Sequence, residues 1–148
     1  MNIIIPLGGK GERFKSEDYH YPKILTNVLG KSIITWVIDS LNITKDDCVT
    51  IIYNYILDQY NFQDILQKEY KNIKFNFIKL PYQTSGPVET ILYGLSKLPD
   101  NILNEKMIIH DGDSFIKNNN FDRITINNEN SNGKICRQYN TINSRNKK

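Results

Sequence analysis

The hydrophobic positions of the chain fall into short apolar runs separated by longer segments with a different spacing. The first run, Asn2–Pro6, is apolar without alternation, which indicates a strand buried on both faces. Similar runs predict strands at Cys48–Tyr53 and Lys106–His110, and the alternating segment Ile73–Leu80 predicts one more strand.

Between these runs, apolar residues recur every three or four positions, as they do on one face of a helix. This spacing predicts helices at Lys31–Leu41, Leu57–Tyr70 and Gly86–Leu98. The side chains expected to face the core are Ile33, Ile34, Val37, Ile38 and Leu41 in the first helix, Tyr60, Ile65 and Leu66 in the second, and Val88, Ile91, Leu92 and Leu95 in the third.

This alternation of strands and helices predicts an α/β fold: an open, mostly parallel, Rossmann-like sheet with helices on both faces and right-handed crossovers. Ligands of such sheets bind beyond the carboxyl ends of the strands. Polar turns follow the first, third and fourth predicted strands, so the topology would bring three distant polar clusters to one edge. We expect a binding site there.

The periodicity stops after Ile126, and we expect one ordered domain over residues 1–127 and a polar, disordered tail over residues 128–148. The formal net charge of the 148 residues is +3. The tail holds five basic residues and a single acid, Glu129, so the basic character belongs to the tail. Nucleic-acid binding needs basic residues clustered on a folded face, and we therefore expect no nucleic-acid partner.

Cysteine usage and hydropathy point to a reduced, cytoplasmic setting. Cys48 and Cys136 are far apart and lack metal-ligand spacing. The apolar start is too short for the core of a signal peptide, and no stretch could span a bilayer, so we expect no membrane partner. His20 and His110 have no partner at ligand spacing and are expected to be structural.

The turn after the first strand, LGGKGERF, has the composition of an anion-binding loop. Gly8 and Gly9 allow the backbone to approach a ligand closely, and successive N–H groups can cradle an anion. Arg13 adds a planar group that suits phosphate oxygens. The alternative is an ordinary turn with a solvated arginine. The P-loop and dinucleotide-binding patterns do not fit, because Leu25 and Phe14 stand where each requires a glycine.

Three further clusters carry possible chemistry. Lys23 follows Pro22 and could act as a point charge toward phosphate, although most exposed lysines have no such role. Gln83 could contact a base edge near Gly86, while the same segment, QTSGPVE, is also an ordinary helix start. The turn Asp111–Asp113 offers carboxylates that suit Mg²⁺, or is a simple Asp-Gly turn.

Taken in order, these segments resemble the sugar-phosphate nucleotidyltransferase family. That family has a G-x-G-x-R loop after its first strand, then P-K-x-L, then Q-x-x-G at the start of a helix, then an aspartate after a strand. The matching segments, at similar spacing over residues 2 to about 117, are Gly9–Arg13, Pro22–Leu25, Gln83–Gly86 and Asp111–Asp113.

The resemblance implies a Mg²⁺-dependent enzyme that transfers a nucleotidyl group from a nucleoside triphosphate to a sugar phosphate or a similar phosphorylated small molecule, releasing pyrophosphate. Lys23 and Arg13 would stabilise the phosphates, and Asp113, with Asp111 as a helper, would hold Mg²⁺. The residues implied to bind the nucleotide are Leu7, Gly8, Gly9, Gly11, Gln83 and Gly86.

The family usually continues well beyond this length and adds an acceptor pocket and a second metal-binding aspartate. We therefore expect a truncation or a shifted reading frame after about Asn127, and poor or no turnover by the isolated chain. Two alternatives stay open. One is a nucleotide-sugar-dependent glycosyltransferase in which Asp111–Asp113 is a D-x-D metal site, and the other is a non-catalytic nucleotide-binding remnant. A sheet edge left exposed by truncation would favour self-association or aggregation.

Overall fold

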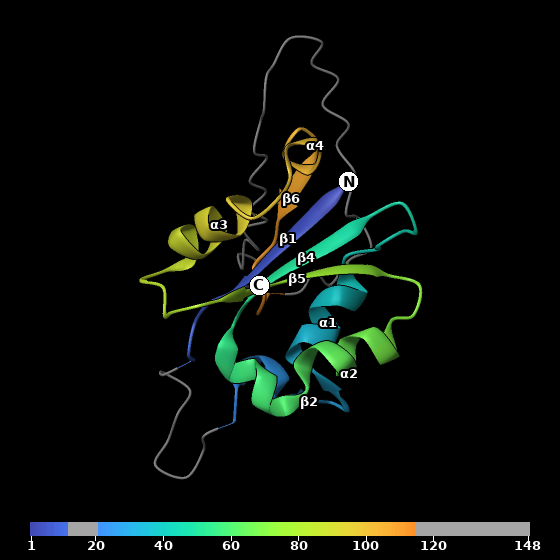
Figure 1. Ribbon diagram of the computed structural model, residues 1–148. Helices are drawn as coiled ribbons and strands as arrows, with labels where there is room; N and C mark the ends of the chain where they lie inside the picture. The colour runs from blue at the N-terminus through green and yellow to red at the C-terminus, as the bar shows by residue number, and fades with distance from the viewer. Residues whose placement is uncertain (12–20, 115–148) are drawn as a thin grey trace, which may run out of the picture.

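The computed structural model describes residues 1–11 and 21–114, and its centre is a parallel sheet. The four strands are β1 (Asn2–Leu7), β4 (Cys48–Asn54), β5 (Lys74–Leu80) and β6 (Met107–Ile109). Their order across the sheet is β5-β4-β1-β6, and every neighbouring pair is parallel (Figure 1). The predicted fold class is confirmed.

The direction of the crossovers explains how the helices are placed. From β1 the chain steps to β4 and β5 through α1 (Ile33–Ser40) and α2 (Phe62–Glu69), which share one face of the sheet (Figure 1). It then returns past β1 to β6 through α3 (Pro87–Leu95) and α4 (Asp100–Leu103). Since right-handed crossovers in opposite directions use opposite faces, α3 lies on the other face. The reversal between β1 and β6 is the position where open α/β sheets bind ligands.

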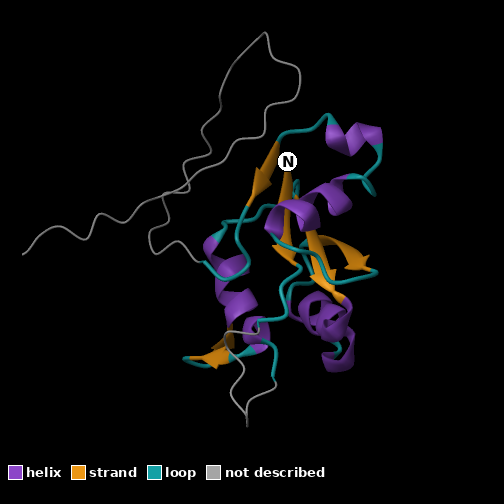
Figure 2. Ribbon diagram, turned by 90° about the vertical axis from the view of Figure 1, so that its left-hand side faces the viewer, coloured by secondary structure: helices purple, strands orange, loops and turns teal. Residues whose placement is uncertain are grey.

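Smaller elements connect the main ones. A 3-10 turn, η2 (Lys23–Leu25), precedes a separate two-stranded sheet, β2 (Asn27–Val28) with β3 (Lys31–Ser32), which projects from the main body (Figure 2). A second 3-10 segment, η3 (Tyr55–Tyr60), follows β4 directly. The helix predicted from Lys31 begins at Ile33, because Ser32 caps it by accepting a hydrogen bond from the Thr35 N–H.

The strands alternate their side chains between two cores, one on each face of the sheet. Ile3, Ile5 and Leu7 of β1 join the larger core under α1 and α2, whereas Ile4 joins the smaller one under α3. β1 is therefore buried on both faces, as its lack of alternation predicts. Of the predicted core face of the first helix, Ile34, Val37, Ile38 and Leu41 are buried, whereas Ile33 is only half-buried.

The prediction of one continuous helix over Leu57–Tyr70 is wrong. The segment is divided at Asn61, whose φ of 51° is left-handed, into η3 and α2. This break rotates the second part, so Phe62 and Leu66 are buried and Ile65, which was expected to face inward, is 47% exposed.

The predicted inner face of α3 is only partly confirmed: Leu95 packs against the smaller core, but two of the predicted residues face solvent. Val88 and Leu92 are 64% and 62% exposed, while Thr90 and Gly94 are buried. A Cβ atom on Gly94 would collide with the Ile52 side chain, so the small residue lets the helix lie close to β4. Close approach, rather than the count of large apolar residues, decides which face is turned inward.

Two predictions fall outside this description. The proposed domain boundary at residue 127 and the tail over residues 128–148 lie outside the described residues. Within residues 1–11 and 21–114, no helix has the length and apolar character needed to cross a bilayer.

Candidate functional site

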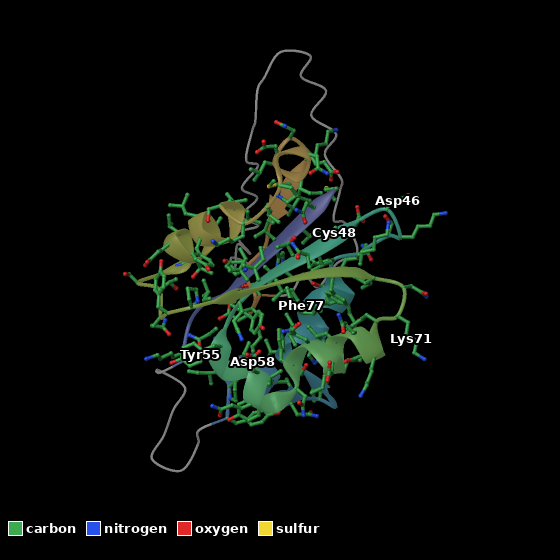
Figure 3. All side chains as sticks on the ribbon, viewed as in Figure 1. Asp46, Cys48, Tyr55, Asp58, Lys71 and Phe77 are labelled. Carbon is green, nitrogen blue, oxygen red and sulfur yellow. The ribbon has the colours of Figure 1, made fainter. Side chains whose placement is uncertain are left out.

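A cleft of about 610 Å³ lies at the carboxyl ends of the strands. Its walls come from all four segments that the sequence singles out: residues 6–11, 22–24, 83–87 and 111–113. In Figure 3, Tyr55 and Asp58 follow the carboxyl end of β4, whereas Asp46 and Cys48 lie at the opposite end of the sheet. Cys48 is therefore remote from the cleft.

The three glycines after β1 have different structural roles. Gly8 is buried, and a Cβ atom there would lie 2.8 Å from the hydroxyl oxygen of Thr84 and still closer to that of Thr90. Gly11 has φ +65°, a left-handed conformation that favours glycine. Gly9 is exposed, with nothing within 4 Å of its Cβ position. Gly8 thus serves close packing, Gly11 the turn, and Gly9 leaves open space in the wall of the cleft.

A network of amides holds the backbone carbonyl of Gly8. Gln83 Nε2 donates to the Gly8 oxygen over 3.0 Å, and Asn54 Nδ2 donates to the same oxygen over 3.3 Å. Asn54 Nδ2 also donates to Gln83 Oε1 over 2.8 Å. Asn54 is 2% exposed, and its Oδ1 accepts from the N–H of Ile56 at the start of η3. The glycine loop is thereby tied to the ends of β4 and β5.

Lys23 and Asp113 form an ion pair inside the cleft. Lys23 Nζ lies 2.7 Å from Asp113 Oδ2, although the two residues are 90 positions apart in the sequence. Both side chains are partly exposed, at 39% and 48%. The predicted phosphate-binding cation and the predicted metal ligand therefore contact each other directly.

The turn that carries the two aspartates is packed against β1. Gly112 is buried, and a Cβ atom on it would collide with the Leu7 side chain, so this position needs a glycine. His110 precedes the turn, and its burial lowers the pKa of its imidazole, while the contact of Nδ1 with the Asp111 carbonyl acts in the opposite direction. The contact between His110 Nδ1 and the Asp111 carbonyl supports the turn.

The amino end of α3 forms another wall of the cleft. Gly86 and Pro87 line the cleft at the start of this helix. Glu89 accepts a hydrogen bond from the Ser85 N–H over 2.6 Å, and this bond lowers the pKa of its carboxyl group. The buried hydroxyls of Thr84 and Thr90 lie 2.7 Å apart, and Thr90 Oγ1 donates to the Gly86 carbonyl over 3.1 Å. These bonds hold residues 84–90 together at the start of α3.

The carboxylates at the cleft fit a magnesium ion that is shared with phosphate. Mg²⁺ at nucleotide sites is held by one or two carboxylates, with phosphate oxygens and water completing its six ligands. Asp111 and Asp113 both line the cleft and are exposed. Among the described residues there is no cluster of three or more His, Cys, Asp or Glu suited to a metal ion. The ammonium group of Lys23 at Asp113 Oδ2 shows that the position accepts a cation.

The structure brings together every predicted site residue that it describes. The cleft is lined by Leu7, Gly8, Gly9, Gly11, Lys23, Gln83, Gly86, Asp111 and Asp113. Arg13, the remaining predicted residue, lies outside the described part of the chain.

Sequence reasoning missed the amide and hydroxyl groups that organise these segments. Asn54 comes directly after an apolar run, at the carboxyl end of its strand. A polar residue at that position is the signal that could have identified it as part of the site. Thr84 lies within the segment QTSGPVE and Thr90 directly follows it, but the sequence indicates a binding role only for Gln83 and Gly86. The burial of the two threonines depends on how closely α3 approaches β1.

The fold and the cleft define an α/β domain with a cleft at the carboxyl ends of its parallel strands, and comparisons with known proteins show what the chain is similar to. No family model matches the chain. The chain is 31% identical over 113 residues to a 2-C-methyl-D-erythritol 4-phosphate cytidylyltransferase from Trichodesmium erythraeum (strain IMS101), covering 76% of this chain and 46% of that protein.

Among solved structures, the chain is similar to a nucleoside-diphosphate-sugar pyrophosphorylase from Vibrio cholerae RC9. The TM-score is 0.63 at 20% identity, over 78% of this chain and 48% of that one. The sequence likeness and the shared fold together support the NTP transferase family for this chain. The chain spans about half the length of the relatives it matches.

Proposed function

We propose that the cleft binds a nucleoside triphosphate together with Mg²⁺ and serves nucleotidyl transfer to a phosphorylated small molecule. The observation that carries this proposal is the convergence of four separate segments on one cleft at the switch between β1 and β6. Each segment contributes what a metal-bound polyphosphate needs: open backbone, a lysine, a helix start and carboxylates.

In the proposed reaction, a phosphate oxygen of the acceptor attacks the α-phosphorus of the triphosphate. The new oxygen–phosphorus bond forms as the bond from the α-phosphorus to the bridging oxygen breaks, and pyrophosphate leaves with that electron pair. The attacking oxygen is already anionic, so no protein base is required. The main cost is bringing anions together, and this cost is lowered by positioned cations.

The residues of the cleft would divide this work. Asp113, with Asp111 beside it, would hold Mg²⁺, which supplies charge neutralisation to the phosphates when bound. Lys23 would contact a phosphate oxygen through its ammonium group. The loop at Gly9 would receive phosphate against its backbone, and Gln83 and Gly86 would lie beside the base. Arg13 would be a further phosphate ligand. We also propose that the protein acts in the cytoplasm.

Equilibrium binding tests the proposal, with the four nucleoside triphosphates titrated by calorimetry in the presence of Mg²⁺. CTP is the first nucleotide to try, because the curated relative is named a cytidylyltransferase. Asp113→Asn should weaken binding about tenfold or more, since it removes a charged ligand. Asp39→Asn is the matched control, because Asp39 pairs with Lys31 in an exposed ion pair that does not line the cleft.

The same titrations separate the alternatives. Binding of a UDP-sugar in preference to every triphosphate would favour the glycosyltransferase alternative. Binding of a triphosphate without pyrophosphate release, with every sugar phosphate and polyol phosphate tried, would favour a non-catalytic nucleotide-binding role. Absence of binding by any triphosphate in the presence of Mg²⁺ would refute the proposed function.

A further inference from the structure

We infer that Lys23 holds the metal position at Asp113 until nucleotide phosphates draw it away, so that metal and triphosphate bind cooperatively rather than one before the other. This inference rests on the proposed function. It assigns a regulatory role to a contact that neither the sequence nor the comparisons indicate: the ion pair between the phosphate-binding lysine and the metal-binding aspartate.

The ammonium group of Lys23 and a bound metal ion would compete for the same atom, Asp113 Oδ2. Lys23 Nζ lies 2.7 Å from Asp113 Oδ2, the distance of a charge-assisted hydrogen bond. A divalent cation coordinated by that oxygen would occupy the same space. The backbone of the lysine is set by η2, which begins at Lys23 directly after Pro22. The side chain extends from this fixed point, and its ammonium group can turn within the cleft.

The energetics allow exchange. Both side chains are partly exposed, at 39% and 48%, and ion pairs of this kind change an equilibrium constant by only about one- to fivefold. A metal ion arriving alone must break this pair and then face the nearby ammonium charge. A triphosphate removes both obstacles, because it offers the lysine a new anionic partner and offers the metal further oxygen ligands.

Reciprocity follows from linkage. If the triphosphate strengthens metal binding, the metal must strengthen triphosphate binding by the same factor. Without metal, a triphosphate would meet an aspartate whose charge repels it and a lysine that is already engaged. Neutralising Lys23 should therefore have opposite effects on two measurable affinities, one for the metal alone and one for the metal–nucleotide complex. Neutralising a lysine with a purely structural role would not strengthen one of these affinities while weakening the other.

The experiment measures Mn²⁺ binding by electron paramagnetic resonance of the free ion, first alone and then with the triphosphate that the wild-type protein binds. Lys23→Met keeps an unbranched apolar stem and removes the charge. We expect at least about threefold tighter binding of Mn²⁺ alone and about tenfold weaker binding of the Mn²⁺–triphosphate complex. Lys31→Met removes another partly exposed, paired lysine, which does not line the cleft, and should change neither affinity.

Equal affinities of wild type and Lys23→Met for Mn²⁺ alone, or weakening of both affinities in the variant, would overturn the inference. Lys23→Gln provides a second neutral variant, and circular dichroism checks that each variant is folded. Failure of the proposed function appears separately, as absence of triphosphate binding by the wild-type protein. If the wild type binds the Mn²⁺–triphosphate complex but the opposite effects are missing, only the exchange of Lys23 is refuted.

Discussion

Replacing Gly8 by alanine should destabilise the fold far more than the same change at Gly9, the next residue of the same loop. A methyl group at Gly8 would lie 2.8 Å from the Thr84 hydroxyl oxygen and closer still to that of Thr90, both on buried residues. At Gly9 the new methyl group would have no neighbour within 4 Å. The pair of variants therefore isolates close packing from the general flexibility of glycine.

The expected magnitude follows from two costs. Forcing a methyl group into a filled space costs about 1–3 kcal/mol. Separating the Thr84 and Thr90 hydroxyls, which lie 2.7 Å apart in the structure, adds about 1 kcal/mol for the lost buried hydrogen bond. Gly8→Ala should thus lower the free energy of unfolding by about 2–4 kcal/mol, whereas Gly9→Ala should change it by about 0.5 kcal/mol or less.

Urea unfolding followed by far-ultraviolet circular dichroism measures both variants in the full chain. A double variant adds a sharper test. Thr90→Ala removes two of the three atoms nearest to the new methyl group, so Gly8→Ala/Thr90→Ala should cost at least about 1 kcal/mol less than the sum of the single changes. Strict additivity, or equal costs at Gly8 and Gly9, would show that this packing argument is wrong.

Two further predictions concern groups around the cleft. Asn54→Ala should lower the free energy of unfolding by about 1–3 kcal/mol in the same urea assay, because it leaves buried partners unpaired, whereas Asn101→Ala, at an exposed position, should cost about 0.5 kcal/mol or less. His110 has a folded-state pKa below the ordinary value, so the unfolded chain binds more protons between the two pKa values and wild-type stability should fall as the pH drops below about 6.5. His110→Gln should reduce this loss between pH 7.5 and pH 5, and an unchanged pH dependence would contradict the argument.

The positions of the strands and the topology of the sheet could be predicted from the sequence, because the strands depend on local composition. The continuous apolar run of β1 indicates burial on both faces, and Ile3, Ile4 and Ile5 are indeed buried on alternating sides. The alternation of strands and helices then restricts the topology, since crossovers are right-handed and parallel strands place their carboxyl ends together. That restriction is what allowed the glycine loop, Gln83 and Asp113 to be expected around one cleft, whereas Lys23 was indicated by the family resemblance.

Helix orientation could not be predicted in the same way. The spacing of apolar residues predicts that Val88 and Leu92 face inward, but the structure buries Thr90 and Gly94 instead. The lack of a side chain at Gly94 permits α3 to approach Ile52. Similarly, the left-handed Asn61 interrupts a segment whose apolar spacing predicts one helix. Both differences arise from contacts or backbone conformations that are set by elements distant in sequence or by the tertiary environment.

The sequence by itself determined the order of the elements, the fold class and the segments that form the cleft, because these follow from hydrophobic periodicity and from the geometry of parallel sheets. Only the tertiary structure decided how those segments contact one another. It joined Lys23 to Asp113 across 90 positions and tied Gly8 to Asn54 and Gln83. Such pairings depend on distances between side chains from separate elements, and a linear pattern carries no information about those distances.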